Sequence, residues 1–353
     1  MHAAAVARVL QDTGEVVLEG VGGSEMAAAG VRLLERTERL SAVGLVESLR
    51  ALPAHVGLLH RISRRFAEAR CDLAILVDYP GLHLRVANAA VAHGVPVLYY
   101  IPPQVWAWGE WRLRALRSRV RAAAVILPFE ESYFNGRGVR ATFVGHPLLD
   151  QPPPPSRDAA RRAVGIEPGA PVLGLFPGSR AVEIARMWPG MWRAARLLQA
   201  DIPELRVVVA AMPSHSYPGA DEFTRWTSGA STVMAAADAG ICKSGTTTLE
   251  AALAGMPMIV TYRLNPVTAA LARRVVQVSK IGLINLVTGR ALAPEYLQGA
   301  ATPRELARGV RPLLDPEGAP ARAQRSSFAA VRDALGSPGA ASRVAELASE
   351  LAA

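Results

Sequence analysis

A run of four prolines, Pro152–Pro155, divides this chain of 353 residues into two halves with the same pattern. Before the run, apolar segments of strand length alternate with longer segments of helical spacing, and the alternation restarts directly after it. Proline fixes its own φ angle and has no amide donor, so the run resists helix and sheet and is typical of a stiff connector. The pattern predicts two α/β domains, 1–150 and 157–353, joined by a linker at 151–156, with a ligand cleft between them.

The apolar segments show no regular alternation of apolar and polar residues, which is typical of parallel strands covered by helices on both faces. Helical spacing marks Gly81–His93 and Glu183–Gln199, and the helical stretch from Pro303 onward is expected to pack back against the sheets. The expected strands are Val16–Gly22, Leu73–Asp78, Val95–Ile101, Val125–Phe129, Thr142–Gly145, Val172–Phe176, Arg206–Ala211, Ala239–Cys242, Met258–Tyr262 and Gly282–Leu286.

Composition limits the class of protein. Half of the residues are hydrophobic and 20% are charged, which excludes a disordered or fibrous chain. Two cysteines, Cys71 and Cys242, cannot form a disulfide framework, so a reducing compartment fits best. The net charge of +9 favours an anionic partner such as a phosphate, a nucleotide or a membrane surface. Because the basic residues are nearly all arginine in a chain rich in Ala, Gly and Pro, we expect no nucleic-acid partner.

The sequence predicts neither a signal peptide nor a membrane-spanning helix. Arg8 interrupts the short apolar start of the chain. The longest stretch free of Asp, Glu, Lys and Arg, Val86–Gly109, contains Pro96, Pro102 and Pro103, which a spanning helix tolerates badly. We therefore expect a protein that is soluble or lies on a membrane surface.

The loop Phe176–Arg180 ends a predicted strand and starts a predicted helix. Gly178 allows a ligand to approach the backbone closely, while free amide groups and the helix dipole favour an anion there. Arg180 adds a fixed charge with forked donors. A tight turn capped by Ser179 explains the same residues equally well.

A second loop, Lys243–Thr248, also follows a short apolar strand and opens a helix. Its hydroxyl and amide groups suit a diphosphate, and Glu250 suits the hydroxyls of a ribose. The alternative is structural, because Thr247 and Glu250 have the spacing of a capping box. Two anion-binding loops in one half of the chain still indicate a nucleotide, although neither loop is a P-loop.

In the first half, Asp78 is the last residue of a predicted strand. Parallel sheets bind their ligands at the carboxyl ends of the strands, so Asp78 is a candidate general base. Capping of the helix after Pro80 is the alternative. His146, next to the linker, is a candidate for lining the cleft, whereas a lone histidine is more often structural. Trp106 and Trp108 suit stacking on a sugar or lining an apolar slot, with core packing as the alternative.

An apolar segment that includes Val43, Val46 and Leu49 is flanked by arginines and suits an interfacial helix on anionic lipid, although a buried helix explains it as well. A basic run between Arg112 and Arg121 suits phosphate or lipid headgroups, and a solvated helix is the alternative. We expect no metal site, because the histidines are scattered and no H-E-x-x-H or D-x-D motif occurs.

Taken together, these segments resemble the lipid A disaccharide synthases, inverting glycosyltransferases of the two-domain GT-B type. The resemblance implies an α/β fold of two Rossmann-like domains with parallel sheets facing a central cleft. The matching landmarks run in order over nearly the whole chain: Gly22–Met26, Val43–Glu47, Val105–Trp108, Pro128–Glu130, Phe143–Leu148, Pro177–Arg180, Glu183, Ser244–Thr246, Pro257–Tyr262, Asn285, Pro294–Glu295 and Gln298.

The resemblance implies a reaction that needs no cofactor or metal. UDP-2,3-diacylglucosamine donates its sugar to the 6-hydroxyl of 2,3-diacylglucosamine 1-phosphate, giving a β-1,6 disaccharide and UDP. The N-terminal domain is expected to face the acceptor lipid and the membrane, and the C-terminal domain to bind the UDP-sugar. The expected location is cytoplasmic, on the inner face of the inner membrane, so the anionic membrane surface is a further partner. A homodimer is retained as another candidate assembly.

The same resemblance implies the roles of individual residues. Asp78 matches the proposed base for the acceptor hydroxyl, and Arg180, with helix N-termini, would stabilise the charge of the departing UDP. The positions expected on the donor side are Gly178, Ser179, Arg180, Glu183, Ser244, Gly245, Thr246, Glu250, Asn285 and Gln298. The positions expected on the acceptor or lipid side are Val43, Val46, Leu49, Trp106, Trp108 and His146.

Two features depart from the family pattern. Family members begin with a strand and a G-E-x-S-G-D loop, and Met1 resembles the residue just after that loop, so we expect a start codon placed too late. Where the family reads D-x-P-D-F-N, this chain has Gly81 in place of the second Asp, which bears on acceptor identity. The alternatives are a diverged paralogue with another acceptor or no turnover, a glucosaminyltransferase of lipid-linked peptidoglycan, and an isomerase similar to UDP-GlcNAc 2-epimerases.

Overall fold

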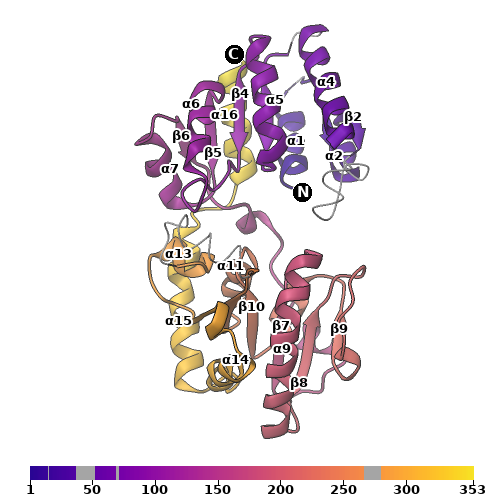
Figure 1. The fold of residues 1–353 in the computed structure, drawn as a ribbon, viewed down its shortest axis with the longest axis vertical. Helices are drawn as coiled ribbons and strands as arrows, with labels where there is room; N and C mark the ends of the chain where they lie inside the picture. Colours follow the sequence, from indigo (N-terminus) through magenta and orange to yellow (C-terminus); the bar gives the residue numbers. More distant parts are fainter. Residues whose placement is uncertain (15, 37–51, 69–70, 266–279) are drawn as a thin grey trace. The chain divides into compact units, whose positions relative to one another are not determined.

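The computed structural model describes residues 1–353 except 15, 37–51, 69–70 and 266–279. Val43, Val46 and Leu49, which the sequence places on the lipid side, lie outside the described residues. The chain forms two compact units (Figure 1). The first contains Met1–Gln151 and Leu335–Ala353, and the second contains Pro152–Ala334.

The first unit is built on a parallel four-stranded sheet in the order β3-β4-β5-β6. Its strands are β3 (Ala74–Val77), β4 (Val97–Tyr100), β5 (Ala122–Val125) and β6 (Ala141–Phe143). A separate parallel pair consists of β1 (Glu19–Gly22) and β2 (Arg32–Arg36). The helices of this unit are α1 (His2–Thr13), α2 (Ser24–Ala28), α4 (Leu52–Glu68), α5 (Pro80–Ala92), α6 (Leu113–Arg119), α7 (Pro128–Asn135) and α16 (Ala340–Ala352), with 3-10 turns η2 (Glu110–Arg112) and η3 (Pro147–Asp150).

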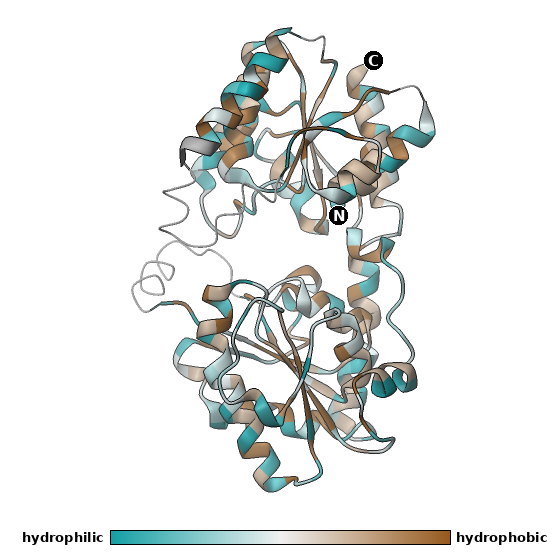
Figure 2. Cartoon of the chain, turned by 90° about the vertical axis from the view of Figure 1, so that its right-hand side faces the viewer, coloured by the Kyte–Doolittle hydropathy of each residue, from teal (hydrophilic) through white to brown (hydrophobic). Residues whose placement is uncertain are grey.

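The two middle strands of this sheet are buried along their whole length, which explains why the sequence shows apolar runs without alternation. Leu98, Tyr99 and Tyr100 are among the largest fully buried side chains. Figure 2 shows the same division by hydropathy, with hydrophobic strands inside and hydrophilic residues on the outward faces of the helices.

The second unit is built on a parallel six-stranded sheet in the order β12-β11-β10-β7-β8-β9. Its strands are β7 (Val172–Phe176), β8 (Arg206–Ala210), β9 (Thr224–Trp226), β10 (Ala239–Lys243), β11 (Met258–Tyr262) and β12 (Glu295–Leu297). Its helices are α8 (Arg157–Ala163), α9 (Ala181–Asp201), α10 (Ala230–Ala236), α11 (Thr247–Leu253), α13 (Leu283–Thr288), α14 (Pro303–Val310) and α15 (Ala319–Ala334), with 3-10 turns η4 (Ala220–Glu222), η5 (Gln298–Ala300) and η6 (Arg311–Leu313).

Two expected strands are wrong. The expected strand Val125–Phe129 is the end of β5 followed by the start of α7, where Pro128 sits in the first turn and leaves no strand pairing. The expected strand Gly282–Leu286 is helix α13. There the carboxylate of Glu295 accepts hydrogen bonds from the amides of Ile281 (3.0 Å) and Gly282 (3.0 Å), at the start of the helix.

The C-terminal segment joins the first unit, whereas the expected second domain extended to residue 353. The amide of His146 donates to the carbonyl of Leu335 at 2.9 Å. Nε of Arg343 donates to the carbonyl of Val144 at 2.8 Å. Helix α16 packs against α1. These contacts close the first unit with residues from the other end of the sequence.

Candidate active site

Two loops leave neighbouring strands of the second unit at the same edge of its sheet. β7 and β10 pair in parallel with Phe176 opposite Cys242, so the loops 177–180 and 243–246 emerge side by side. The first loop leads into α9, whose leading amides have no partner within the helix and carry the positive end of its dipole. The carboxyl edge of a parallel sheet is where such folds bind ligands. These are the two loops that the sequence predicts to bind an anion.

Two glycines allow these loops to close around one cation. Gly178 and Gly245 have φ angles of 109° and 147°. A Cβ on Gly178 would lie 2.8 Å from Oε2 of Glu183, and one on Gly245 would lie 3.2 Å from Nζ of Lys243. Lys243 and Glu183 form an ion pair at 3.0 Å, and Arg180 lies 3.4 Å from the same carboxylate oxygen. A larger residue at either glycine would displace this pair.

The part of the second unit around the loops 177–180 and 243–246 is strongly cationic. The side chain of Arg180 is 80% exposed, whereas that of Lys243 is 16% exposed and held between the loops. Arg186 and Arg263 line a small pocket of about 340 Å³ together with Leu264 and Asn265. Fixed and exposed cations beside free amide groups suit a diphosphate, which needs both charge and hydrogen-bond donors.

The remaining residues of the second loop are used in different ways. Thr246 is exposed, whereas Ser244 is buried and its hydroxyl donates to the carbonyl of Ile281 at 2.7 Å. The capping box considered from the sequence does not form, because Thr246 is the N-cap of α11 and no side chain caps the helix. Glu250 lies one turn into α11, where burial raises the pKa of its carboxyl group.

Asn285 and Gln298 are hydrogen-bonded within the second unit. The buried amide of Asn285 donates to the carbonyl of Ala293 (2.7 Å) and to Glu295 (2.8 Å), and its oxygen accepts from the amide of Ala293 (2.9 Å). Gln298, with φ of 51°, accepts a hydrogen bond from the amide of Leu264 at 3.2 Å. Both residues therefore brace the loops beside β11, and a contact with the sugar stays a prediction.

Asp78 lies at the end of β3, exposed, in a strained turn of the first unit. Asp78 and Tyr79 have φ angles of 53° and 45°, in a region that side chains other than glycine rarely adopt. The Asp78 carbonyl accepts hydrogen bonds from Nδ1 of His83 (2.6 Å) and from the hydroxyl of Tyr99 (3.0 Å). The expected alternative, in which Asp78 caps the next helix, does not occur, because Tyr79 is the N-cap of α5 and no side chain caps it.

The three remaining candidates of the first unit differ in exposure. Trp106 is buried, and its indole donates to Glu130 at 2.8 Å. Trp108 is 56% exposed. His146 is buried, and its Nδ1 accepts from the amide of Leu148 at 3.2 Å, so Nε2 carries the proton. That Nε2 has no partner among the described residues, and burial, with the charge of His2, lowers the pKa of His146 to about 4.

Sequence reasoning missed several residues at these two edges. Lys243 and Glu295 hold the loops of the second unit; the sequence places them in the loop Lys243–Thr248 and the landmark Pro294–Glu295 but gives neither side chain a role. Tyr99 and His83 hold the Asp78 turn. The only sequence feature that points to them is their position within a predicted strand or soon after one. His2 lies within electrostatic range of Asp78, although burial lowers its pKa overall.

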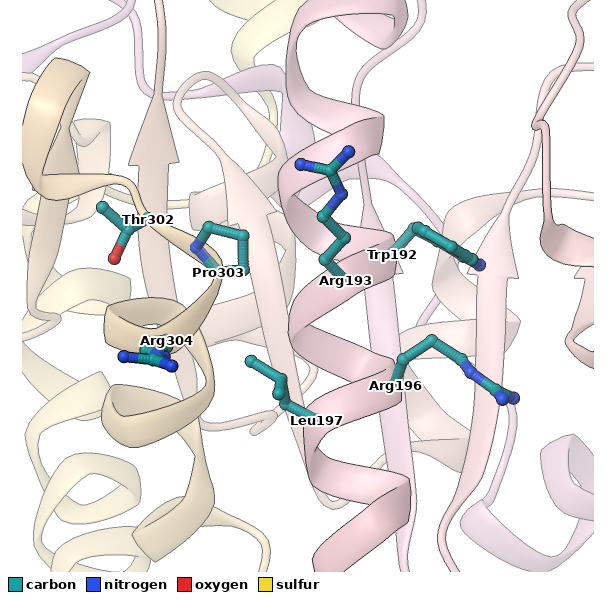
Figure 3. A pocket seen from close by; sticks show the side chains of 7 residues that line it. All are labelled: Trp192, Arg193, Arg196, Leu197, Thr302, Pro303 and Arg304. Carbon is teal, nitrogen blue, oxygen red and sulfur yellow. The ribbon is translucent and has the colours of Figure 1, made fainter.

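A larger pocket of about 650 Å³ lies between α9 and α14, lined by Trp192, Arg193, Arg196, Leu197, Thr302, Pro303 and Arg304 (Figure 3). It begins 11 residues after the first residue of α9, which corresponds to about 16 Å along the helix. Figure 3 shows its three guanidinium groups pointing in different directions, and Arg196 is paired with Glu222. This pocket is therefore separate from the loops and has no converging cations.

Among the described residues, no group of three or more His, Cys, Asp or Glu side chains is arranged to hold a metal ion. The described helices include none that is long and apolar enough to cross a membrane.

The architecture is shared with solved structures in complex with UDP-GlcNAc or UDP. A UDP-GlcNAc 2-epimerase from Neisseria meningitidis, bound to UDP-GlcNAc, aligns with a TM-score of 0.69 at 10% identity, covering 99% of this chain and 98% of that one. UGT89C1 from Arabidopsis thaliana, in complex with UDP, aligns with a TM-score of 0.66 at 13% identity, covering 100% and 96%. At such low identity these likenesses establish the fold, which is α/β with parallel sheets as in GT-B glycosyltransferases and UDP-GlcNAc 2-epimerases.

Sequence comparison identifies the family. The profile of the lipid-A-disaccharide synthetases matches residues 1–338. Lipid-A-disaccharide synthases from Myxococcus xanthus (strain DK1622) and Anaeromyxobacter sp. (strain K) are 40% and 39% identical, covering 94% and 93% of this chain and 89% and 88% of theirs. The chain belongs to the lipid-A-disaccharide synthetase family and is a glycosyltransferase of lipid A biosynthesis. The resemblance drawn from the sequence motifs and the GT-B fold are both confirmed.

Proposed function

We propose that the first unit presents the acceptor glycolipid to Asp78 while the second unit holds UDP-2,3-diacylglucosamine at the loops 177–180 and 243–246. Asp78 takes the proton of the 6-hydroxyl of 2,3-diacylglucosamine 1-phosphate as its oxygen attacks C1 of the donor sugar. The bond from C1 to the diphosphate oxygen breaks, and its electron pair leaves with UDP. Attack from the opposite face inverts C1 and gives the β-1,6 disaccharide.

The observation that carries the donor side of this proposal is the cluster of cations and glycines at the ends of β7 and β10. Arg180 and Lys243 meet at one carboxylate, Glu183, and the closer ion pair holds Lys243 in position before a ligand arrives. Preorganised cations and amides of this kind stabilise the negative charge that develops on a leaving diphosphate without further rearrangement. The acceptor side rests on Asp78, an exposed carboxylate in a turn held by two hydrogen bonds to its own carbonyl.

The same proposal places the chain on the inner face of the inner membrane, as a peripheral protein. Its support is the net charge of +9 together with the diacylated substrates of the family. An excess of positive charge is attracted to anionic lipid, by about 1 kcal/mol for each basic residue close to the surface. Sedimentation with vesicles containing phosphatidylglycerol checks this part of the proposal, and binding that is equal with uncharged vesicles would contradict it.

The catalytic part is tested with Asp78→Asn, which keeps the size of the side chain and removes its basicity. The transfer is followed by mass spectrometry of the disaccharide formed from the two named substrates. Loss of a general base lowers turnover by about 10²- to 10⁴-fold, while the affinity for UDP, measured by calorimetry, stays that of the unaltered chain. Asp72→Asn, at an exposed residue before β3, is the matched control. An Asp78→Asn variant with the normal rate removes Asp78 as the base.

A further inference from the structure

An arginine lies over two exposed tryptophans in the segment between β4 and α6 of the first unit. The guanidinium carbon of Arg112 is 4.5 Å from the ring centre of Trp108 and 4.5 Å from that of Trp111. The two indoles are 56% and 73% exposed. Among the described residues, Arg112 has no ion pair and no hydrogen bond to a carboxylate. We call Trp108, Arg112 and Trp111 the Trp–Arg–Trp stack.

The local backbone is shaped to allow this arrangement. Gly109 has a φ angle of 83°, and a Cβ at this position would lie 2.6 Å from Nη1 of Arg112 and 3.6 Å from the indole nitrogen of Trp111. A residue other than glycine would strain the turn at this φ angle, and the end of the Arg112 side chain would have to shift to make room for its Cβ. The glycine therefore leaves room for the half-buried Arg112 side chain to lie over both indoles.

The segment that carries the stack leaves β4 at the sheet edge where the Asp78 turn leaves β3. β3 and β4 are neighbours, and the amide of Asp78 donates to the carbonyl of Tyr100 at 3.0 Å. The hydroxyl of Tyr99 donates to the carbonyl of Asp78, and Arg112 is close enough to Tyr99 for its charge to favour the ionised hydroxyl, although burial raises the pKa of Tyr99 overall. The cation of the stack and the proposed base therefore belong to the same edge of the sheet.

A guanidinium that lies over aromatic rings keeps its N–H groups, which point outward in its own plane, available to donate. That planar fork matches the oxygens of a phosphate, and an arginine already held in place loses little side-chain freedom when it binds one. The exposed indole faces offer apolar, flat surfaces to a sugar or an acyl chain beside the phosphate. The chemistry that fits is a phosphate monoester attached to an amphiphilic sugar.

We propose that the Trp–Arg–Trp stack binds the phosphate of the acceptor glycolipid and so helps to orient its 6-hydroxyl toward Asp78. This inference rests on the proposed function, because the acceptor of that reaction carries a phosphate. It makes Arg112 a substrate-binding residue that distinguishes a phosphorylated acceptor from one without phosphate.

The test compares the Arg112→Gln variant with the unaltered chain in the disaccharide assay. The two acceptors are 2,3-diacylglucosamine 1-phosphate and the same glycolipid without phosphate, both in mixed detergent micelles. We expect the KM for the phosphorylated acceptor to rise by about tenfold or more, since a charge-assisted bidentate contact is lost. The KM for the UDP-sugar and the rate with the unphosphorylated acceptor stay unchanged. Arg112→Lys keeps the charge without the fork and gives a smaller rise. Arg140→Gln, at an exposed arginine just before β6 and outside the basic run, is the matched control. Equal losses with both acceptors, or no change in either, overturn the proposal.

Two further measurements test binding of the acceptor phosphate without turnover and distinguish it from contact with a lipid headgroup. Titration of the intrinsic tryptophan fluorescence with glucosamine 1-phosphate gives saturable quenching in the full chain, which Arg112→Gln abolishes and which glucosamine alone does not cause. This binding signal needs no turnover, so it tests the stack even if the transfer reaction itself is not observed. The lipid headgroup is the other source of phosphate. If Arg112→Gln weakens sedimentation with phosphatidylglycerol vesicles and leaves both acceptor KM values unchanged, the stack is a membrane contact and the proposal is wrong.

Discussion

At the scale of single residues, the Asp78 turn shows how a strained backbone can position a functional group. Two adjacent residues other than glycine, Asp78 and Tyr79, adopt positive φ angles. Such conformations cost on the order of 1–3 kcal/mol each and persist where the surroundings determine them. Here the surroundings are Tyr99 and His83, which donate hydrogen bonds to the Asp78 carbonyl from a neighbouring strand and from α5. Tyr99 is therefore a positioning residue for the proposed base.

Tyr99→Phe removes one of these two hydrogen bonds and leaves the ring in place. We expect kcat to fall by about tenfold, because loss of about 1.4 kcal/mol of positioning energy corresponds to that factor. The KM for the UDP-sugar stays unchanged, since its proposed site belongs to the other unit. Tyr100→Phe is the matched control, because the Tyr100 hydroxyl makes no hydrogen bond within the described part of the chain. Steady-state kinetics on both variants decides the matter, and equal losses in the two would show a general effect on the sheet.

At the scale of elements, the start of α7 depends on a buried carboxyl group. Glu130 accepts hydrogen bonds from the indole of Trp106 (2.8 Å) and from the amides of Ile126 (3.3 Å) and Leu127 (3.1 Å). Burial is the largest influence on this group and raises its pKa to about 7, against the lowering effect of its hydrogen bonds. The helix start, the turn after β5 and the Trp106 ring are thus joined through one side chain.

This pKa has a consequence for stability. Between about pH 4.5 and pH 7 the folded chain binds the Glu130 proton more tightly than the unfolded chain does. The free energy of unfolding therefore falls as the pH rises through this range, by on the order of 3 kcal/mol. Glu130→Gln removes this part of the pH dependence, although it also lowers stability at every pH because the amide cannot accept all three hydrogen bonds. Urea unfolding at pH 5 and pH 7.5 measures the change. Glu346→Gln, at an exposed residue of α16, is the control and keeps the pH dependence of the unaltered chain. If Glu130→Gln also kept that pH dependence, Glu130 would not be the group responsible for it.

The sequence pattern predicts elements well where burial is simple and poorly where long-range partners decide. The apolar runs Val172–Phe176 and Met258–Tyr262 predict β7 and β11 at the observed bounds. The run Gly282–Leu286, which forms most of α13, is also largely apolar. The amides at its start donate to the carboxylate of Glu295, a partner from a later segment that no local pattern reveals. At the candidate site, the glycine loops can be recognised from the local sequence. The role of Lys243 cannot, because it depends on an ion pair with Glu183, sixty positions earlier in the sequence.

At the scale of the whole molecule, the proline run predicts where the first unit ends along the chain but not where the last helix belongs. Helix α16 has an ordinary amphipathic pattern, and such a pattern does not say which sheet it will cover. What assigns it to the first unit is a set of contacts between distant segments. Gly145, with φ of 79°, lets the chain after β6 approach the backbone of Ser337, where a Cβ would lie 2.9 Å from the carbonyl oxygen. The first unit is therefore built from two segments that lie far apart in the sequence.

Arg343 is the residue that tests this closure. Its guanidinium donates to the carbonyls of Val144 (2.8 Å), Ser337 (2.6 Å) and Pro338 (3.0 Å), so it fastens α16 to the end of β6. We expect Arg343→Ala to destabilise the first unit by about 1–2 kcal/mol, since the partly buried carbonyl of Val144 and two exposed carbonyls lose a charged donor. Hydrogen exchange followed by mass spectrometry should show faster exchange in peptides from α1, β6 and α16, with β7 and α9 unchanged. Arg332→Ala, at an exposed arginine near the end of α15, is the matched control and should alter neither unit. Faster exchange of both units in Arg343→Ala would mean that they unfold together, and unchanged exchange of α16 would mean that its packing against α1 holds it without the arginine.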